Sequence, residues 1–581
     1  MNIQTLCPPF STALINIYRE STDLFLGANT LLSQEGTTQG DPLAMPFYAL
    51  ATKPLIDRLS TDTPDLKQIW YADDATAAGK ISDLKKWWDN LTKLGPSFGY
   101  FVNPKKTWLV TKDGSLSTAS QIFGDSEVNI TTEGRPVLGS PIGKQEFISD
   151  FVTGKVTHWI AEIEKLSEIA DSQPHAAYGA ITHGLASKWA YLSRTTPDID
   201  QLLLPLENSI RTTLLPKLTG RDAPNDLERS LFALPARLGG LNIGNPASLA
   251  VEQYTSSQQV TKPLVDLIAS QNKNYPYEVL VHQINTKNKI KETRRSTGLQ
   301  VANEIQEFLT PPMQLATDLA REKGASSWLT ALPLEEHGFA LHKTAFRDAI
   351  ALRYGWPPSQ IPTNCVCGHS FSVQHALSCP RGGFPSIRHN ELRDITASLL
   401  KETCHGVATE PSLQPITSET FNRTTANRQN GARLDVVANG FWGSSFERAF
   451  FDVRVFNPFA PSNRHSSLTA SYRHHENLKK RHYEQRIREV EHSSFTPLVF
   501  ATTGGLGPAA GAFYKRLASM LSDKWKQPYS TTIGWLRCRI SFSLLRSSIM
   551  CLRGARSSKS SFNGHLAASV DLTIADSNLS V

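Results

Sequence analysis

Two adjacent carboxylates, Asp73 and Asp74, are the most informative candidates for chemistry in the sequence. They follow the β-branched and aromatic run from Ile69 to Tyr71 and precede small residues up to Gly79, a pattern typical of two short strands joined by a tight turn. At the tip of such a turn, both carboxylates can face one divalent cation. Mg²⁺ prefers one or two carboxylates with substrate phosphates, and paired metal ions can clamp both oxygens of an in-line displacement. The alternative is a solvated Asp-Asp turn.

A loop rich in glycine and threonine lies upstream of this turn. It ends in Gln39-Gly40-Asp41-Pro42 and leads into an apolar stretch with helical spacing. Glycines let a backbone approach a nucleotide closely, and the Gln39 side chain offers amide donors and an acceptor. The loop therefore indicates nucleotide binding by these four residues.

The loop followed by Tyr71-Ala72-Asp73-Asp74 resembles the palm of reverse transcriptases of non-LTR retrotransposons. The resemblance implies an RNA-directed DNA polymerase in which Asp73 and Asp74 bind catalytic Mg²⁺ (or Mn²⁺). It also implies deoxynucleoside triphosphates, an RNA template and a DNA target as partners. Downstream, Gly99 to Thr107 resembles a family motif whose lysine approaches the incoming triphosphate. That role falls to Lys106, with Lys105 as the neighbouring alternative.

The family's palm needs a third metal-binding aspartate upstream of the loop. Apart from Asp41, the only aspartate there is Asp23, which begins an expected hairpin outside the family's setting for this residue. The fingers have no counterpart either. The resemblance therefore implies an N-terminally truncated polymerase with an incomplete catalytic site, and Met1 corresponds to an internal methionine of a longer ancestral frame.

A second cluster combines three cysteines and a histidine within fifteen residues: Cys365, Cys367, His375 and Cys379. Three thiolates and one imidazole suit tetrahedral Zn²⁺, whose ligation offsets the lack of a core in so short a segment. A structural zinc is favoured over a catalytic one because four ligands fill the coordination shell. His369 is a competing ligand, and the alternative is a set of unconnected core cysteines and surface histidines.

Two further aspartates, Asp435 and Asp452, each lie within a strand-like apolar run. A buried aspartate without a partner is costly, so two acids on adjacent strands favour a shared divalent cation that activates water against a phosphodiester. The alternative places both acids at strand edges facing water. The following block from Arg473 to Arg488 is dense in arginine, lysine and histidine, which suits either phosphate binding or a solvated helix face.

The order of zinc knuckle, helix and two acidic strands resembles the restriction-like endonuclease module, of the PD-(D/E)XK type, that ends site-specific non-LTR elements. The resemblance implies that Asp435 and Asp452 bind catalytic Mg²⁺. The family moves the nuclease lysine to a following helix, which corresponds to Lys479, with Lys480 as the neighbouring alternative. The family usually has proline before the first acid, where this chain has Leu434.

Other positions around the two acids stay open. Arg454 occupies the lysine place of the commoner Asp-x-Lys arrangement, but an arginine cannot act as a base at neutral pH. Glu410 or Glu391 could add a metal ligand, and the sequence does not decide between them.

Composition bounds the class of protein. The chain has 581 residues, 40% of them hydrophobic and 19% charged, as in ordinary globular proteins. A net charge of +7 permits a nucleic-acid partner. Seven scattered cysteines do not suggest a disulfide framework, and no apolar run is long enough for a membrane span. We expect an intracellular, nuclear protein.

We therefore expect an α+β multidomain protein. The expected domains are a partial reverse-transcriptase palm (1–145), a helical thumb-like region (146–270), a helical linker (271–360), the zinc knuckle (361–385), a restriction-like α/β nuclease core (386–530) and a C-terminal tail (531–581). The expected function is DNA nicking and reverse transcription of a retrotransposon, with the polymerase incomplete. The alternative is a catalytically inactive, nucleic-acid-binding remnant of a transposable element.

Overall fold

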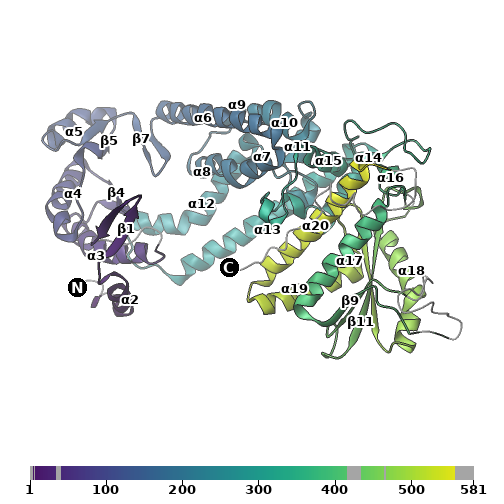
Figure 1. The fold of residues 1–581 in the computed structure, drawn as a ribbon. Helices are drawn as coiled ribbons and strands as arrows, with labels where there is room; N and C mark the ends of the chain where they lie inside the picture. The colour runs from purple at the N-terminus through teal and green to yellow at the C-terminus, as the bar shows by residue number, and fades with distance from the viewer. Residues whose placement is uncertain are drawn as a thin grey trace. The chain divides into compact units, whose positions relative to one another are not determined.

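Helices and small sheets alternate along the chain, in agreement with the expected mixed α+β class (Figure 1). The computed structural model describes residues 4–5, 7–34, 41–414, 416, 433–463 and 466–556. It divides into two compact units. Unit 1 contains Met1–Lys155, Tyr191–Leu202 and Ala250–Glu292, and unit 2 contains Val156–Ala190, Leu203–Leu249 and Thr293–Val581. The expected thumb-like region and helical linker each contribute residues to both units.

Unit 1 contains short strand pairs between helices. Its elements are α2 (Pro8–Tyr18), β1 (Thr22–Leu26), β2 (Asn29–Ser33), α3 (Ala44–Asp62), β3 (Lys67–Tyr71), β4 (Asp74–Ala78), α4 (Ile81–Leu94), β5 (Trp108–Val110), α5 (Leu116–Phe123), β6 (Asn129–Thr131), β7 (Gly134–Val137) and β8 (Ser140–Gly143). Among the described residues these strands pair only two by two. Leu55, Leu59 and Trp87 form a core between α3 and α4, beside the β3–β4 hairpin.

Three long helices contribute residues to both units: α6 (Gln145–Ser172), α12 (Pro246–Ser270) and α13 (Tyr277–Phe308). Helix α6 buries an apolar stripe that includes Val152, Val156 and Ile163. None of the described helices is both long and apolar enough to span a membrane.

Unit 2 contains a helical part and a sheet-based part. The helical part includes α7 (Pro174–Ala180), α8 (Ala186–Thr195, which ends in unit 1), α9 (Leu204–Ser209), α10 (Leu215–Thr219), α11 (Asp226–Ala233), α14 (Pro311–Arg321) and α15 (Lys343–Tyr354). The other part comprises α16 (Val373–Ala376), α17 (Phe384–Thr403), β9 (His405–Thr409), β10 (Val436–Asn439), β11 (Arg448–Phe456), α18 (Leu468–Glu489), β12 (Ser494–Ala501), α19 (Pro508–Trp525) and α20 (Tyr529–Arg553).

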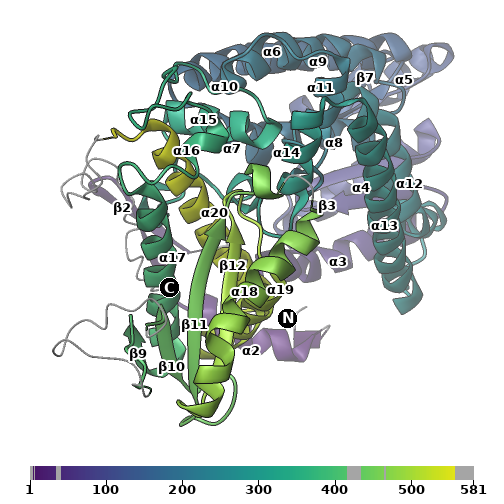
Figure 2. The same cartoon turned by 90° about the vertical axis from the view of Figure 1, so that its right-hand side faces the viewer.

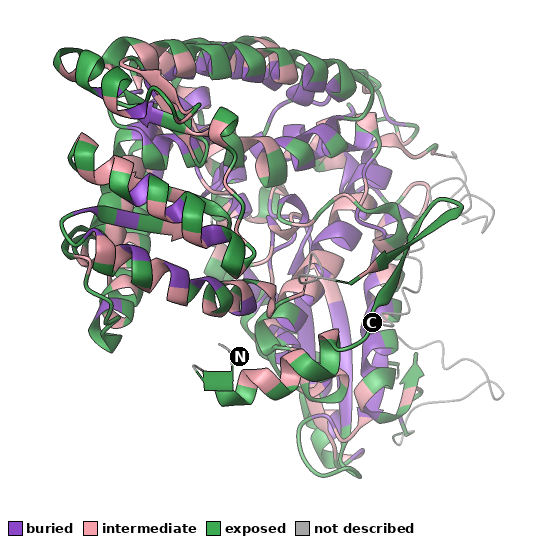
Figure 3. Ribbon diagram, turned by 90° about the vertical axis from the view of Figure 1, so that its left-hand side faces the viewer, coloured by how far each residue is buried: buried purple, intermediate pink, exposed green. Residues whose placement is uncertain are grey.

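The strands of the second part form one four-stranded sheet in the order β12-β11-β10-β9 (Figure 2). Strands β9, β10 and β11 are antiparallel neighbours, whereas β11 and β12 are parallel and joined by helix α18. A parallel pair needs such a crossover because a tight hairpin cannot connect it. The strands β11 and β12 are largely buried, as the purple strands in Figure 3 show.

Alternation along β11 sends its side chains to two different layers. Phe451 and Val453 belong to the core shared with α17, α19 and α20, whereas Phe450 packs with Tyr483 and Ile487 of α18. The sheet therefore lies between α18 on one face and three helices on the other.

Residues 531–553, expected as part of a tail, instead form most of helix α20. Its residues Ile533, Leu536, Ile540 and Leu544 belong to the same core as α17 and α19. The apolar spacing of this helix is interrupted by serines and arginines, which obscure the stripe in the sequence. The folded core thus extends well beyond the expected boundary at 530.

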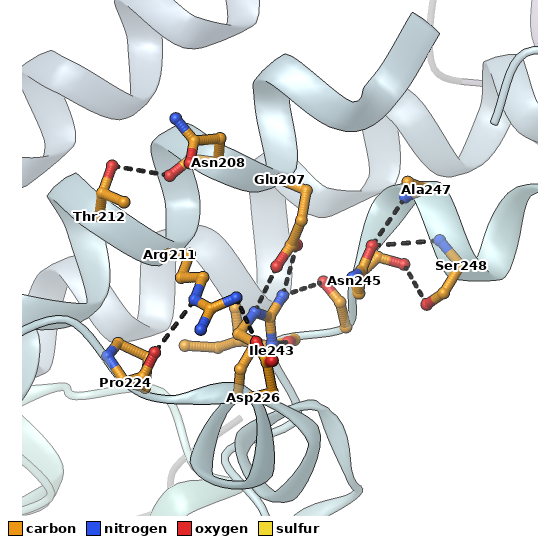
Figure 4. A network of polar contacts seen from close by, with 12 residues as sticks. Glu207, Asn208, Arg211, Thr212, Pro224, Asp226, Ile243, Asn245, Ala247 and Ser248 are labelled. Carbon is orange, nitrogen blue, oxygen red and sulfur yellow. Dashed lines mark hydrogen bonds and ion pairs between the residues drawn. The ribbon is translucent and has the colours of Figure 1, made fainter. Parts of the chain in front are cut away.

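A buried ion pair holds the helical part of unit 2 together (Figure 4). Arg229 donates to both carboxylate oxygens of Glu207 at 2.6 and 2.7 Å, and also to the carbonyl oxygens of Ile243 and Gly244. Arg229 is 4% exposed and Glu207 is 8% exposed. The bidentate geometry and the added carbonyl acceptors satisfy the guanidinium away from water.

We predict that Arg229→Ala destabilises unit 2 by about 3–5 kcal/mol, because it leaves the Glu207 carboxylate buried without its cation. Chemical denaturation of the full chain would measure the loss. The double variant Arg229→Met/Glu207→Leu should recover most of it. As a matched control, Lys524→Ala removes an exposed ion pair with Glu402 and should cost less than about 1 kcal/mol. Equal shifts for Arg229→Ala and Lys524→Ala would contradict the account.

Candidate functional site

The first acidic pair lies at the tip of the β3–β4 hairpin, as the sequence predicts. Tyr71 pairs with Asp74, so Ala72 and Asp73 form a two-residue turn. Ala72 has a φ of 52°, the left-handed conformation that such a tight turn requires. Asp73 and Asp74 are both exposed.

Two tyrosines line the backbone beside this turn. The Tyr100 hydroxyl donates to the Asp73 carbonyl oxygen at 2.8 Å. Burial, with smaller contributions from the neighbouring Tyr48, Asp73 and Asp74, raises the pKa of Tyr100 to about 12. Burial and Asp73 also raise the pKa of Tyr48. No group of three His, Cys, Asp or Glu ligands gathers at this turn within the part of the chain that the structure describes.

The other expected polymerase residues are distributed over separate elements. Asp41 opens helix α3: its carboxylate accepts from the Leu43 N–H at 2.8 Å and from the Tyr18 hydroxyl, and these bonds lower its pKa. Pro42 follows in the same turn. Gln39 and Gly40 lie outside the described residues.

Lys106 ends a short 3-10 turn, Pro104–Lys106, and both it and Lys105 are exposed. Within the part of the chain that the structure describes, no hydrogen bond or ion pair joins Lys106 to Asp73 or Asp74. Asp23 lies in the exposed strand β1, opposite Leu32. The structure thus places Asp73 and Asp74 at one hairpin tip, and no third carboxylate is grouped with them among the described residues.

The four expected zinc ligands come together in unit 2. The ligand atoms of Cys365, Cys367, His375 and Cys379 all lie within 4.8 Å of one another. Cys365 Sγ lies 3.9 Å from Cys379 Sγ, and Cys367 Sγ lies 3.2 Å from His375 Nε2. Two thiolates bound to one tetrahedral zinc at about 2.3 Å are about 3.8 Å apart, so the spacing fits. This cluster could bind a metal such as zinc.

Local backbone bonds shape this knuckle. The Cys365 N–H donates to the His369 carbonyl and the Gly368 N–H donates to the Cys365 carbonyl, both at 2.9 Å. Gly368 has a φ of 91°, which closes the turn between the first two cysteines and His369. The Ser372 hydroxyl accepts from the His375 N–H and so begins helix α16, which carries His375 toward the cysteines.

The knuckle thiols differ in their electrostatics. Hydrogen bonding with the His369 backbone lowers the pKa of Cys367 to about 6, whereas burial raises the pKa of Cys379. His369 Nδ1 lies 3.5 Å from Cys367 Sγ, so this histidine remains an alternative neighbour of one ligand.

The second acidic pair sits across two neighbouring strands. Val436 of β10 pairs with Phe451 of β11, so the antiparallel register places Asp435, just before β10, opposite Asp452. Side chains directly opposite each other on one face have Cβ atoms about 4.5–5.5 Å apart. Asp435 Oδ2 also accepts from the Val453 N–H at 2.6 Å, which fixes the first acid beside the second.

Asp452 is buried in the sheet and contacts one cation. It is 3% exposed, and Lys479 Nζ of helix α18 lies 2.7 Å from its Oδ2. Burial raises the pKa of Asp452 to about 6; Lys479 opposes this shift, and Asp435 adds to it. Lys479, rather than its neighbour Lys480, therefore reaches the acids from the helix that crosses the sheet.

Helix α17 adds two residues that the sequence motifs did not indicate. His389 Nε2 lies 2.9 Å from Asp435 Oδ1. Arg393, one turn further along α17, pairs with Asp394 and Glu410, and Asp394, Glu410 and Asp435 raise its pKa. The signal is visible in retrospect: His389 and Arg393 are polar at i and i+4 on one side of a helix whose other side is apolar.

The two open glutamates differ in their surroundings. Glu410 pairs with Arg393 and Arg433, and its N–H donates to the Asp435 carbonyl at 2.8 Å. Burial raises the pKa of Glu391, and residues of α20 on the opposite side, not the acid pair, surround it. Of the two, Glu410 is the one connected to Asp435.

Arg454 lies on the same face of β11 as Asp452, near His475 of helix α18. Burial, with smaller contributions from the Arg454 charge and His474, lowers the pKa of His475 to about 4. The His475 ring lies against Phe456 at an interplanar angle of 39°, with ring centroids 4.6 Å apart. Arg454 is thus part of the packing between β11 and α18.

No model of a known protein family matches the sequence, and a search of curated proteins found no match.

We predict that the wild-type chain retains about one equivalent of zinc after dialysis and that Cys379→Ser loses it, because a hydroxyl is a poor replacement for a thiolate ligand. Atomic absorption of the purified full chain measures the metal. Cys538→Ser, outside the cluster, and His369→Ala should both retain zinc. If His369→Ala loses zinc and His375→Ala retains it, His369 is the imidazole ligand, which would contradict the assignment of His375.

Proposed function

We propose that unit 2 is a metal-dependent endonuclease that nicks DNA, using Asp435, Asp452 and Lys479. The single observation that carries this proposal is the 3% exposed Asp452, placed opposite Asp435 and 2.7 Å from the Lys479 amine. Two carboxylates facing each other in a sheet interior repel, and one ammonium neutralises only one of them. The excess negative charge favours a divalent cation at this place.

Asp435 and Asp452 offer two carboxylates for Mg²⁺ or Mn²⁺. Carboxylate oxygens are the ligands that these hard cations prefer, and a site with two carboxylates leaves positions for water and phosphate oxygens. Asp435 and Asp452 would hold the cation, whereas the Glu410 carboxylate is paired with Arg393 and Arg433. When bound, the metal would lower the pKa of a coordinated water and polarise the phosphodiester.

The remaining residues have distinct roles in this proposal. His389 orients Asp435 through its contact at 2.9 Å, and the Val453 N–H holds the other oxygen. Lys479, whose amine lies 2.7 Å from Asp452, would donate to a phosphate oxygen, where negative charge develops during the displacement. The exposed cations on α18, among them Arg473, Arg481 and Arg488, can contact the phosphates of a DNA duplex.

The resemblance to non-LTR retrotransposons extends the proposal to the whole chain. It assigns unit 1 to a reverse-transcriptase palm that binds deoxynucleoside triphosphates, an RNA template and a DNA target, and it places the protein in the nucleus. The exposed pair Asp73 and Asp74 supports a cation site at the β3–β4 turn. Without a third aspartate, we propose that DNA nicking rather than DNA synthesis is the activity of this chain.

A second candidate is a nucleic-acid-binding protein without catalysis. One observation favours it: both oxygens of Asp435 already have partners, His389 and the Val453 N–H, while Lys479 neutralises Asp452. Such a network can be stable without a metal. The two candidates differ in whether a divalent cation changes a DNA substrate.

We predict that the purified chain converts supercoiled plasmid to the nicked form with Mg²⁺ or Mn²⁺, and that Asp452→Asn lowers the rate at least about a hundredfold, because it removes a charged metal ligand. The change keeps the size of the side chain. Asp523→Asn, an exposed aspartate on α19, is the charge-matched control and should nick at the wild-type rate. Equal rates for Asp452→Asn and the wild type would refute the assignment of Asp452.

We also predict that nicking declines as the pH falls through about 6, because Asp452 must be ionised to bind a cation and burial raises its pKa to about 6. More Mg²⁺ should move the midpoint to lower pH, since the metal competes with the proton. The sign for stability is opposite: a raised pKa means that the folded state holds the proton more tightly, so this contribution is present at low pH and is lost as the pH rises through about 6. A pH–rate profile without decline between about pH 7 and about pH 5 would contradict this prediction.

A further inference from the structure

An open cavity of about 670 Å³ lies in unit 2 between the first turns of α18, helix α19 and helix α20. Its walls include Leu506, Leu536 and Ile540, which give it an apolar floor. Cavities of this size and character are typical of small-molecule and nucleotide sites. None of the acid-pair or zinc-cluster residues lines it.

Charged groups surround this floor unequally. The lining contains three cations, Lys323, Lys515 and Arg537, and one carboxylate, Glu322. The Tyr472 hydroxyl donates to Glu322 Oε2 at 3.2 Å, and burial raises the pKa of Glu322 to about 7. With three cations and one carboxylate, the lining has an excess of positive charge around an apolar surface.

Two glycines pack closely against side chains beside this cavity. A side chain at Gly505 would collide with the Glu322 carboxylate and the Tyr472 hydroxyl, and one at Gly507 would collide with Glu476. The first turn of α19 is already capped, because the Ala509 N–H donates to Glu476 Oε1 at 2.9 Å. The glycine-rich segment therefore permits close packing beside the cavity, and the attraction for an anion comes from the three cations instead.

Helix α18 connects this cavity to the acid pair. Tyr472 lines the cavity and Lys479 contacts Asp452, and both are on the side of α18 that packs on the sheet. Seven residues correspond to two helical turns, or about 10 Å along the axis. A DNA strand whose phosphate contacts Lys479 would therefore pass near a nucleotide held in the cavity.

We propose that this cavity binds an unpaired nucleotide of the DNA strand, next to the phosphate that the acid pair attacks. This inference rests on the proposed endonuclease function. The base stacks on the apolar floor, and the phosphate attached to that nucleotide contacts Lys515 and Arg537. A base in a duplex cannot enter, so the cavity favours single-stranded or unpaired DNA.

The test uses the full chain and a fluorescein-labelled single-stranded oligonucleotide with Ca²⁺ in place of Mg²⁺. Ala512→Trp fills the cavity from an exposed position of α19 without removing a core contact or a charge. Ser519→Trp, exposed two turns further along α19 and outside the lining, is the matched control. A second probe carries abasic sites in place of its bases.

We expect Ala512→Trp to weaken binding of the normal strand about tenfold, the range of one lost base stack, while Ser519→Trp binds as the wild type does. The wild type should bind the abasic probe about tenfold more weakly than the normal strand. The wild type and Ala512→Trp should bind the abasic probe equally. The inference is overturned if the wild type does not bind the single strand, if both probes bind the wild type equally, or if both tryptophan variants behave alike. Plasmid nicking is measured separately: equal nicking by Asp452→Asn and the wild type would refute the endonuclease without changing the binding result.

Discussion

The withdrawal of Asp452 from water is the constraint on which the candidate nuclease site depends. A carboxylate that is 3% exposed on a central strand is unfavourable in its charged form, and the raised pKa of Asp452 expresses that cost. The Lys479 ammonium offsets part of this free-energy cost, and the Asp435 carboxylate increases it. A cation that contacts both carboxylates would therefore stabilise the site.

The sheet order explains how this balance is built. Antiparallel pairing of β10 with β11 sets the two aspartates opposite each other, and parallel pairing of β11 with β12 requires the crossover helix α18, which brings Lys479 over the sheet. Helix α17 packs on the opposite face of the sheet, and its His389 contacts Asp435 just before β10. Each charged group at the site therefore comes from a different element of one layered fold.

Local patterns in the sequence predicted local structure well. The hairpin that presents Asp73 and Asp74, the strands carrying Asp435 and Asp452, and the grouping of Cys365 with three other ligands follow from short-range residue patterns. Long-range features were not predictable in the same way. The contact of His389 with Asp435 joins residues 46 positions apart, and no periodicity reports it. Helix α20 was missed because its serines and arginines interrupt an apolar stripe that only the folded core reveals.

The most direct measurement replaces Mg²⁺ with Fe²⁺ in the full chain and lets hydroxyl radicals cut the polypeptide beside the bound metal, with the cuts located by mass spectrometry. If Asp435 and Asp452 share a cation, the cuts fall next to both residues, and an excess of Mg²⁺ suppresses them. Cuts confined to the segment from Cys365 to Cys379, or no cuts that Mg²⁺ suppresses, would contradict a shared cation at the acid pair.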